Sequence, residues 1–67
     1  MLEVLISEPF DSDYKIEVFN NLGSLKQKTL KNKNENIFQI NLSEYIAGIY
    51  LIKIETQKSV YLFRIIN

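Results

Sequence analysis

The segment Tyr50-Leu-Ile-Lys-Ile-Glu-Thr-Gln-Lys-Ser-Val-Tyr-Leu-Phe-Arg-Ile65 decides the fold, because it alternates between two faces on either side of a short polar break. A tight turn at Gln57-Lys58 pairs its two halves in antiparallel register, so that residues directly opposite each other share a face. One face is then entirely apolar, with Tyr50, Ile52 and Ile54 opposite Ile65, Phe63 and Tyr61. The other face pairs Leu51 with Arg64, Lys53 with Leu62 and Glu55 with Val60. We therefore expect a β-hairpin with one core face and one partly solvated face.

Four more segments toward the N-terminus show the same two-residue period and are separated by clusters of Asn, Asp, Gly, Pro and Lys. Three are expected strands at residues 2–7, 14–20 and 24 to about 31. The fourth places Phe38, Ile40 and Leu42 inward. Residues 43–47 read as one short helical turn that leads into Gly48. No stretch with a helical period competes with these strands.

The first expected hairpin turns at Asn20-Asn-Leu-Gly23. Gly23 is predicted to adopt a left-handed conformation in a three-residue loop with a bulge, because glycine has positive φ without steric cost. In the strand that follows, Leu25 and Leu30 are five positions apart, so a regular strand would place their side chains on opposite faces. A bulge must lie between them if both are buried, and the sequence leaves this register open.

Four lysines gather on this third strand and the loop after it, at positions 26, 28, 31 and 33. One interpretation is a patch that binds anions. The other is an exposed edge strand whose charges prevent pairing with other chains. The balanced total charge favours the edge strand.

Short strands with hairpin connections predict an all-β protein, a small antiparallel immunoglobulin-like β-sandwich of about six to seven strands. A parallel sheet would need helical crossovers, for which the chain has no room. We expect residues 1–67 to form a single domain. The first residues lack the features of a signal peptide, and the longest apolar run, residues 46–52, is too short to span a bilayer. If the native protein is exported, we therefore expect this domain to be a piece excised from a longer secreted protein.

Composition excludes several classes of function. Eight basic residues balance eight acidic ones, so the attraction that drives nonspecific nucleic-acid binding is missing. The chain has neither cysteine nor histidine, which removes disulfides, thiolate nucleophiles, Ser-His-Asp triads and the usual zinc ligands. The carboxylates are scattered rather than paired across a cleft. We expect no enzyme, no cofactor and no nucleic-acid partner.

Two binding alternatives stay open. Glu8, Asp11 and Asp13 are candidate calcium ligands, although the segment lacks the glycine and glutamate of an EF-hand loop and reads more simply as a capped turn. The four tyrosines, Tyr14, Tyr45, Tyr50 and Tyr61, suggest a carbohydrate-binding or adhesive β-sandwich module. Core packing is the simpler reading of three of them, which leaves Tyr45 as the free candidate.

The motifs in their order along the chain resemble a known family. The Val-Phe-Asn-Asn-Leu-Gly turn ending at Gly23 is followed by Ile40-Asn-Leu-Ser43, then Ala47-Gly-Ile-Tyr-Leu-Ile-Lys-Ile54, and a closing Tyr61-Leu-Phe-Arg-Ile-Ile66. Together these stretches resemble the C-terminal sorting domain that Bacteroidetes proteins carry for export through the type IX secretion system. Such a domain sits at the end of a cargo protein, is recognised by the outer-membrane translocon, and is cut off by a cell-surface sortase.

The resemblance implies a non-catalytic address label and a secreted or cell-surface location reached through the periplasm and outer membrane. It assigns the sorting motif to three groups of residues: the turn glycines Gly23 and Gly48, the strand signature Ile49, Tyr50 and Leu51, and the terminal Arg64, Ile65, Ile66 and Asn67. The Asn-Pro segment that usually opens these domains is absent, and the lysine-rich terminus is reduced to Arg64. An opening strand trimmed from the domain would leave an open sheet edge, through which two copies can pair as a homodimer.

Overall fold

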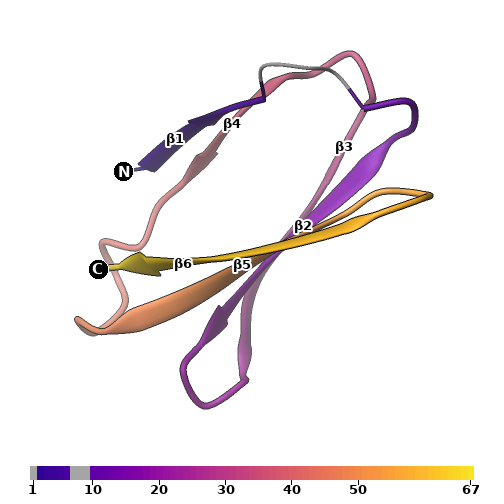
Figure 1. Ribbon diagram of the computed structural model, residues 1–67. Coiled ribbons are helices and arrows are strands. Elements are labelled where there is room, and N and C mark those ends of the chain that lie inside the picture. The colour runs from indigo at the N-terminus through magenta and orange to yellow at the C-terminus, as the bar shows by residue number, and fades with distance from the viewer. Residues whose placement is uncertain (1, 7–9) are drawn as a thin grey trace.

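The computed structural model describes residues 2–6 and 10–67, and this part of the chain contains six strands and no helix (Figure 1). The strands are β1 (Leu2–Leu5), β2 (Tyr14–Asn20), β3 (Leu25–Lys31), β4 (Ile37–Ile40), β5 (Ile49–Glu55) and β6 (Val60–Ile66). The predicted all-β class is confirmed. The end of the first predicted strand, at Ser7, lies outside the described residues. Within the described residues there is also no helix long and apolar enough to cross a membrane.

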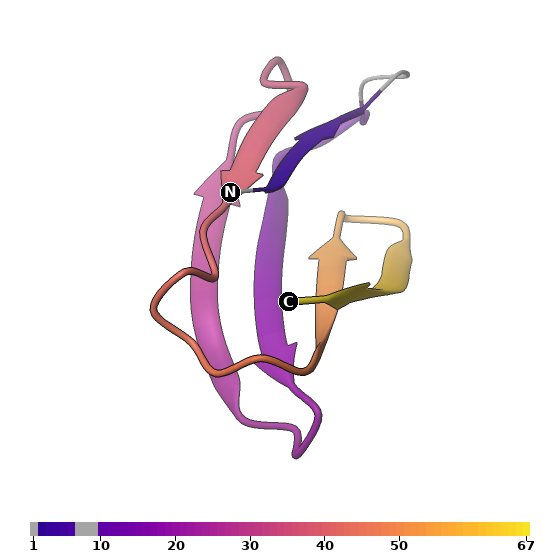
Figure 2. The same cartoon turned by 90° about the vertical axis from the view of Figure 1, so that its left-hand side faces the viewer.

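The strands form two antiparallel sheets that stack face to face (Figure 2). The larger sheet has the order β3-β2-β5-β6, and the smaller one pairs β1 with β4. The pairing of β5 with β6 confirms the predicted register at every position, from Tyr50 opposite Ile65 to Glu55 opposite Val60. The backbone N–H of Thr56 donates to the carbonyl of Ser59 at 2.8 Å, which closes the two-residue turn at Gln57-Lys58.

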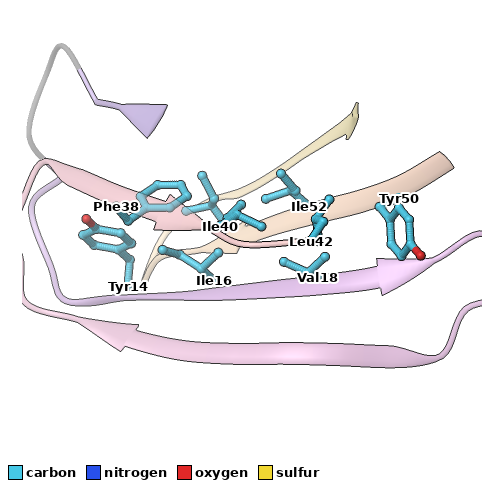
Figure 3. Close-up of a cluster of buried hydrophobic side chains, with 9 residues drawn as sticks. Tyr14, Ile16, Val18, Phe38, Ile40, Leu42, Tyr50 and Ile52 are labelled. Carbon is cyan, nitrogen blue, oxygen red and sulfur yellow. The ribbon is translucent and has the colours of Figure 1, made fainter. Parts of the chain in front are cut away.

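The core lies between the two sheets and, among the described residues, contains nine buried apolar side chains (Figure 3). β2, β4 and β5 each contribute every second residue, because successive side chains of a strand point to opposite faces. The nine are Tyr14, Ile16 and Val18 of β2, Phe38, Ile40 and the following Leu42, and Tyr50, Ile52 and Ile54 of β5. The inward positions predicted for 38, 40 and 42 are confirmed.

The apolar face of β6 is only partly covered, which corrects the expectation that it belongs wholly to the core. Phe63 and Ile65 pack against the core but are half-buried, and Tyr61 is 47% exposed. Strands lie about 4.8 Å apart, so a two-stranded sheet is roughly half as wide as a four-stranded one. The smaller sheet therefore cannot cover the outermost strand of the larger one.

The hairpin between β2 and β3 has the predicted glycine conformation, with a φ of 86° at Gly23. The backbone N–H of Gly23 donates to the carbonyl of Asn20 at 3.0 Å, and the Asn20 side chain accepts the N–H groups of Leu22 and Ser24 at 3.0 and 2.9 Å. The turn is thus held by one asparagine at its start and one glycine at its end.

The bulge on β3 occurs at Lys26, since Val18 lies opposite Gln27 and Phe19 lies opposite Leu25. This bulge does bring Leu25 and Leu30 to the same face, but that face is the outer one, and both leucines are exposed. Polar Gln27 takes the inner position instead. In the part of the chain that the structure describes, β3 pairs with β2 alone, so the prediction that the lysine-rich segment is an edge strand is confirmed.

Residues 43–47 do not form the expected helical turn. The N–H of Tyr45 donates to the carbonyl of Leu42 at 3.0 Å, which makes one hydrogen-bonded turn, and the chain then bends at residues 45 and 47–48 before β5 begins at Ile49. Gly48, just before the strand, has a φ of 154°.

We predict that Ile52→Ala lowers the free energy of unfolding by about 2–5 kcal/mol, because the Ile52 side chain is 0% exposed and truncation leaves a cavity. Leu30→Ala is the matched control, since Leu30 is 75% exposed on the outer face. It should change the stability by no more than about 0.5 kcal/mol. Urea unfolding followed by circular dichroism measures both, and equal losses would contradict this account of the core.

Candidate functional site

The residues singled out by sequence gather at one end of the larger sheet. Ile49 lies opposite Ile66, and Leu51 lies opposite Arg64. The remaining pair of the motif, Tyr50 and Ile65, is also in register between them. The turn that contains Gly23 extends from the same end, since Asn20 of β2 lies opposite Tyr50. On the outer face Ile49 and Leu51 therefore form one surface with Arg64 and Ile66, whereas Tyr50 is buried in the core on the inner face.

A group of backbone carbonyls holds the side chain of Asn67 at this end. Its amide nitrogen donates to the carbonyl oxygens of Leu42, Tyr45 and Ile46 at 3.1, 3.2 and 3.3 Å. The backbone of Asn67 pairs with Gly48 in both directions, at 2.8 and 3.4 Å. The loop between β4 and β5 thus fixes the last residue of the chain through three acceptors and a strand pair. We call this arrangement the Asn67 clamp.

Two tyrosines support the loop that makes the clamp. The Tyr50 hydroxyl donates to the carbonyl of Ile46 at 2.7 Å, and the rings of Tyr45 and Tyr50 stack with centroids 6.0 Å apart. The Tyr45 hydroxyl donates to the carbonyl of Lys26 at 3.2 Å and accepts from the Gln27 amide at 3.3 Å. Sequence reasoning missed the partners of Asn67, because Leu42, Tyr45 and Ile46 act through backbone carbonyls that no residue type reveals.

The outer face of the sheet is apolar around the clamped end. Ile49 and Ile66 are exposed there as neighbours across the pair β5-β6, and Leu51 and Phe19 continue the patch toward β2 and β3. Arg64 is exposed on the same face, opposite Leu51. Apolar side chains with one cation at their border are a surface suited to contact with another protein.

The other half of the outer face carries alternating charges. Lys15 contacts the carboxylates of Glu55 at 3.0 Å and Glu17 at 3.7 Å, and Lys53 approaches Glu17 at 3.9 Å. The hydrogen-bonded Glu55 raises the pKa of Lys15, and Lys15 in turn lowers the pKa of Glu55. These groups are solvated and satisfy one another, so this half of the face is an ordinary polar surface.

The candidate calcium ligands do not form a site in the described residues. The Asp13 carboxylate accepts the backbone N–H of Lys33 at 2.9 Å, and Asp11 lies 4.0 Å from the Lys58 ammonium group. Glu8 lies outside the described residues. No group of three or more acidic residues able to hold a metal occurs in residues 2–6 and 10–67. Asp13 acts as the cap of a turn.

Tyr45 is not the free aromatic platform that the sequence suggested. Its ring is half-buried against the core and stacks on Tyr50, while its hydroxyl is already hydrogen-bonded. Tyr14 is buried and donates to the carbonyl of Glu35 at 2.6 Å, so desolvation raises its pKa. Tyr14, Tyr45 and Tyr50 thus pack the core and hold loops, whereas Tyr61 is 47% exposed and stacks on Phe10.

The fold and the clamp together define a class of protein, a small antiparallel β-sandwich. Its distinguishing feature is the terminal Asn67, which is hydrogen-bonded to the loop between β4 and β5. The comparison with known families is specific. The family described as "Secretion system C-terminal sorting domain" matches residues 2–67, and the chain belongs to this family. No curated protein and no solved structure matches this chain.

Membership confirms the resemblance seen in the sequence. Domains of this family are non-catalytic signals for type IX secretion in Bacteroidetes, and they mark proteins that cross the outer membrane to the cell surface or the medium. The function of the chain is therefore that of a sorting domain, and its interaction partner is the secretion machinery.

We predict that Asn67→Asp weakens the clamp, although the two side chains have the same shape. A carboxylate would face three carbonyl oxygens in place of an amide donor. Exchange of the amide hydrogens of Gly48 and Asn67 should accelerate by about tenfold or more. NMR hydrogen exchange measures this. Asn34→Asp, the same change in an exposed loop, should leave both rates unaltered, and a similar effect of the two variants would contradict the clamp.

Proposed function

We propose that the chain is the export address of an upstream cargo protein, and that the secretion machinery reads the clamped end of β6 together with the start of β5. The residues assigned to this role are Gly23 and Gly48, the signature Ile49, Tyr50 and Leu51, and the terminal Arg64, Ile65, Ile66 and Asn67. The Asn67 clamp is the observation that carries the proposal. Residues 1–67 act as one domain, excised here from a longer secreted protein.

The clamp gives the terminal strand a defined conformation. The last residues of a domain ordinarily fray unless something ties them down. Here the Asn67 side-chain amide donates hydrogen bonds to carbonyls of the loop between β4 and β5, and Ile66 is paired with Ile49. A receptor can then recognise Arg64 and Ile66 on a rigid surface, without the entropic cost of ordering a free tail.

The partners that we propose are the type IX translocon, the cell-surface sortase that removes the domain, and the cargo that precedes it. A further proposed partner is a second copy of the chain, which pairs with the first through an open sheet edge. We propose no catalytic activity for the chain itself. The carbohydrate-binding alternative finds no support in the geometry, since the hydroxyl of its free candidate, Tyr45, is occupied by Lys26 and Gln27.

The test is a secretion assay with the 67 residues fused to the C-terminus of a fluorescent reporter that carries a signal peptide, in a host with type IX secretion. The intact fusion should reach the medium or the cell surface. Deletion of residues 64–67 should hold the reporter in the periplasm, because it removes the recognised end of β6. Fluorescence of the separated fractions measures the distribution.

Point variants separate recognition of the clamped end from simple loss of the tail. We expect Asn67→Asp to reduce export several-fold and Asn34→Asp to leave it unchanged. Thermal unfolding of each purified variant checks that the sandwich persists. Full export of the 64–67 deletion would overturn the proposal, as would retention of the intact fusion in the periplasm while the domain is folded.

A further inference from the structure

The two edges of the larger sheet differ in their protection against other chains. β3, on one side, carries Lys26, Lys28 and Lys31, the kind of charge that blocks pairing at an edge. β6, on the other side, has Arg64 as its single charge among seven residues. Figure 2 shows β6 at the border of the sheet, with β5 as its neighbour. Within the described residues β6 pairs with β5 alone, so one edge is protected by lysines and the other is open.

The direction of the free backbone groups of β6 follows from its pairing with β5. Gly48 and Asn67 exchange both of their hydrogen bonds, and Thr56 donates to Ser59. In an antiparallel pair, residues that exchange hydrogen bonds alternate with residues that do not. The odd-numbered residues of β6 therefore bond toward β5. The even-numbered ones direct their N–H and C=O groups to the open edge, and they are Val60, Leu62, Arg64 and Ile66.

We propose that two copies of this chain pair antiparallel through β6, about a two-fold axis that passes between their Phe63 residues. In this register Leu62 lies opposite Arg64 of the second copy, Val60 opposite Ile66, and Tyr61 opposite Ile65. The pairs of even-numbered residues are the hydrogen-bonded ones, in agreement with the free groups of the edge. All seven residues of the strand take part, and no like charges face each other.

The same construction fails at the other edge of the sheet. A pair of β3 strands centred on Lys28 would set that lysine opposite its own copy and bring six lysine side chains onto two strands. Like charges directly opposite each other destabilise a strand pair. The facing lysines therefore disfavour pairing through β3, and β6, where no like charges face each other, is the edge that meets a second copy.

Pairing through β6 also covers apolar surface that the fold of one copy leaves in water. Tyr61 is 47% exposed and Leu62 is 65% exposed, and each meets an apolar neighbour or an aliphatic arginine stem across the axis. The two larger sheets become one sheet with β6 at its centre. A single strand pair buries less than a standard interface, so we expect a weak dimer with a dissociation constant between about 10 μM and 1 mM.

The dimer has a consequence for sorting, which rests on the proposed function. Pairing covers Arg64 and Ile66, two of the residues that we assign to recognition by the translocon. The exported form is then the monomer, and self-association competes with recognition at the same strand.

Sedimentation equilibrium of the purified 67-residue chain, from about 10 μM to 1 mM, tests the pairing. Leu62→Lys places a lysine opposite Arg64 of the second copy, and the two-fold axis repeats this like-charge pair. The variant should therefore weaken association at least tenfold. Leu62→Glu sets a carboxylate there instead and should strengthen association several-fold. The matched control, Leu30→Lys, makes the same change on the lysine-protected edge and should leave association unaltered.

Because Leu62 also lies opposite Lys53 within one copy, thermal unfolding must show that each variant is folded. The double variant Leu62→Lys with Arg64→Glu sets opposite charges across the axis again and should restore association. A wild-type chain that stays monomeric up to 1 mM would overturn the proposal. An equal loss of association in Leu62→Lys and Leu30→Lys would also overturn it.

A single cysteine tests the register, since the chain has none of its own. Phe63 meets its own copy at a non-hydrogen-bonded pair, where Cα atoms are about 4.5 Å apart and a disulfide can form. Phe63→Cys should give a covalent dimer under mild oxidation, and Thr29→Cys on β3 should not. Association without this cross-link would contradict the register.

The result for the dimer and the result for sorting are independent of each other. Sedimentation uses the purified chain and no secretion machinery, so a monomer there leaves the export assay untouched. A reporter fusion that carries Leu62→Lys should still be exported, because Leu62 is not among the residues assigned to recognition. Retention of this fusion would contradict the monomer as the exported form.

Discussion

The burial of nine apolar side chains between two sheets of unequal width is the constraint on which the rest of the domain depends. The chain has no cysteine, so this core supplies the stability that disulfides provide in many small secreted domains. Each fully buried large apolar side chain contributes roughly 1.5–3 kcal/mol. β2, β4 and β5 provide these residues, and they therefore fix the position of every other element.

The unequal widths determine which surfaces remain for function. Two strands, β1 and β4, cover the middle of the larger sheet and leave β6 half covered on its inner side. β6 is consequently an edge strand with apolar residues on both faces, whereas β3 at the opposite edge is polar and rich in lysine. β6 thus combines the open edge with the terminal residues that we propose as the export signal.

The end of β6 is ordered by contacts with a loop that lies far from it in the sequence. Asn67 reaches carbonyls of Leu42, Tyr45 and Ile46, and the tyrosine pair beneath the loop keeps those carbonyls in place. Under the recognition that we propose for this end, the export signal is a folded surface and not a linear tag. Recognition and folding are then linked, because loss of the loop geometry also releases the chain end.

Local alternation in the sequence determined the strands, the turn at Gly23 and the full register of β5 with β6. These features follow from the two-residue period and from the freedom of glycine, both of which are properties of neighbouring residues. The motifs from Val18 to Gly23 and from Ala47 to Ile54 also sufficed to identify the family. The tertiary structure alone decided that Leu25 and Leu30 face outward, that Tyr61 is half exposed, that Tyr45 is engaged, and that Asn67 is clamped. Those outcomes depend on the register of β3 with β2, on how wide the opposite sheet is, and on which backbone carbonyls meet a side chain some twenty residues away. A period of two residues assigns a side chain to a face, but only the packing of the sheets decides whether that face is covered.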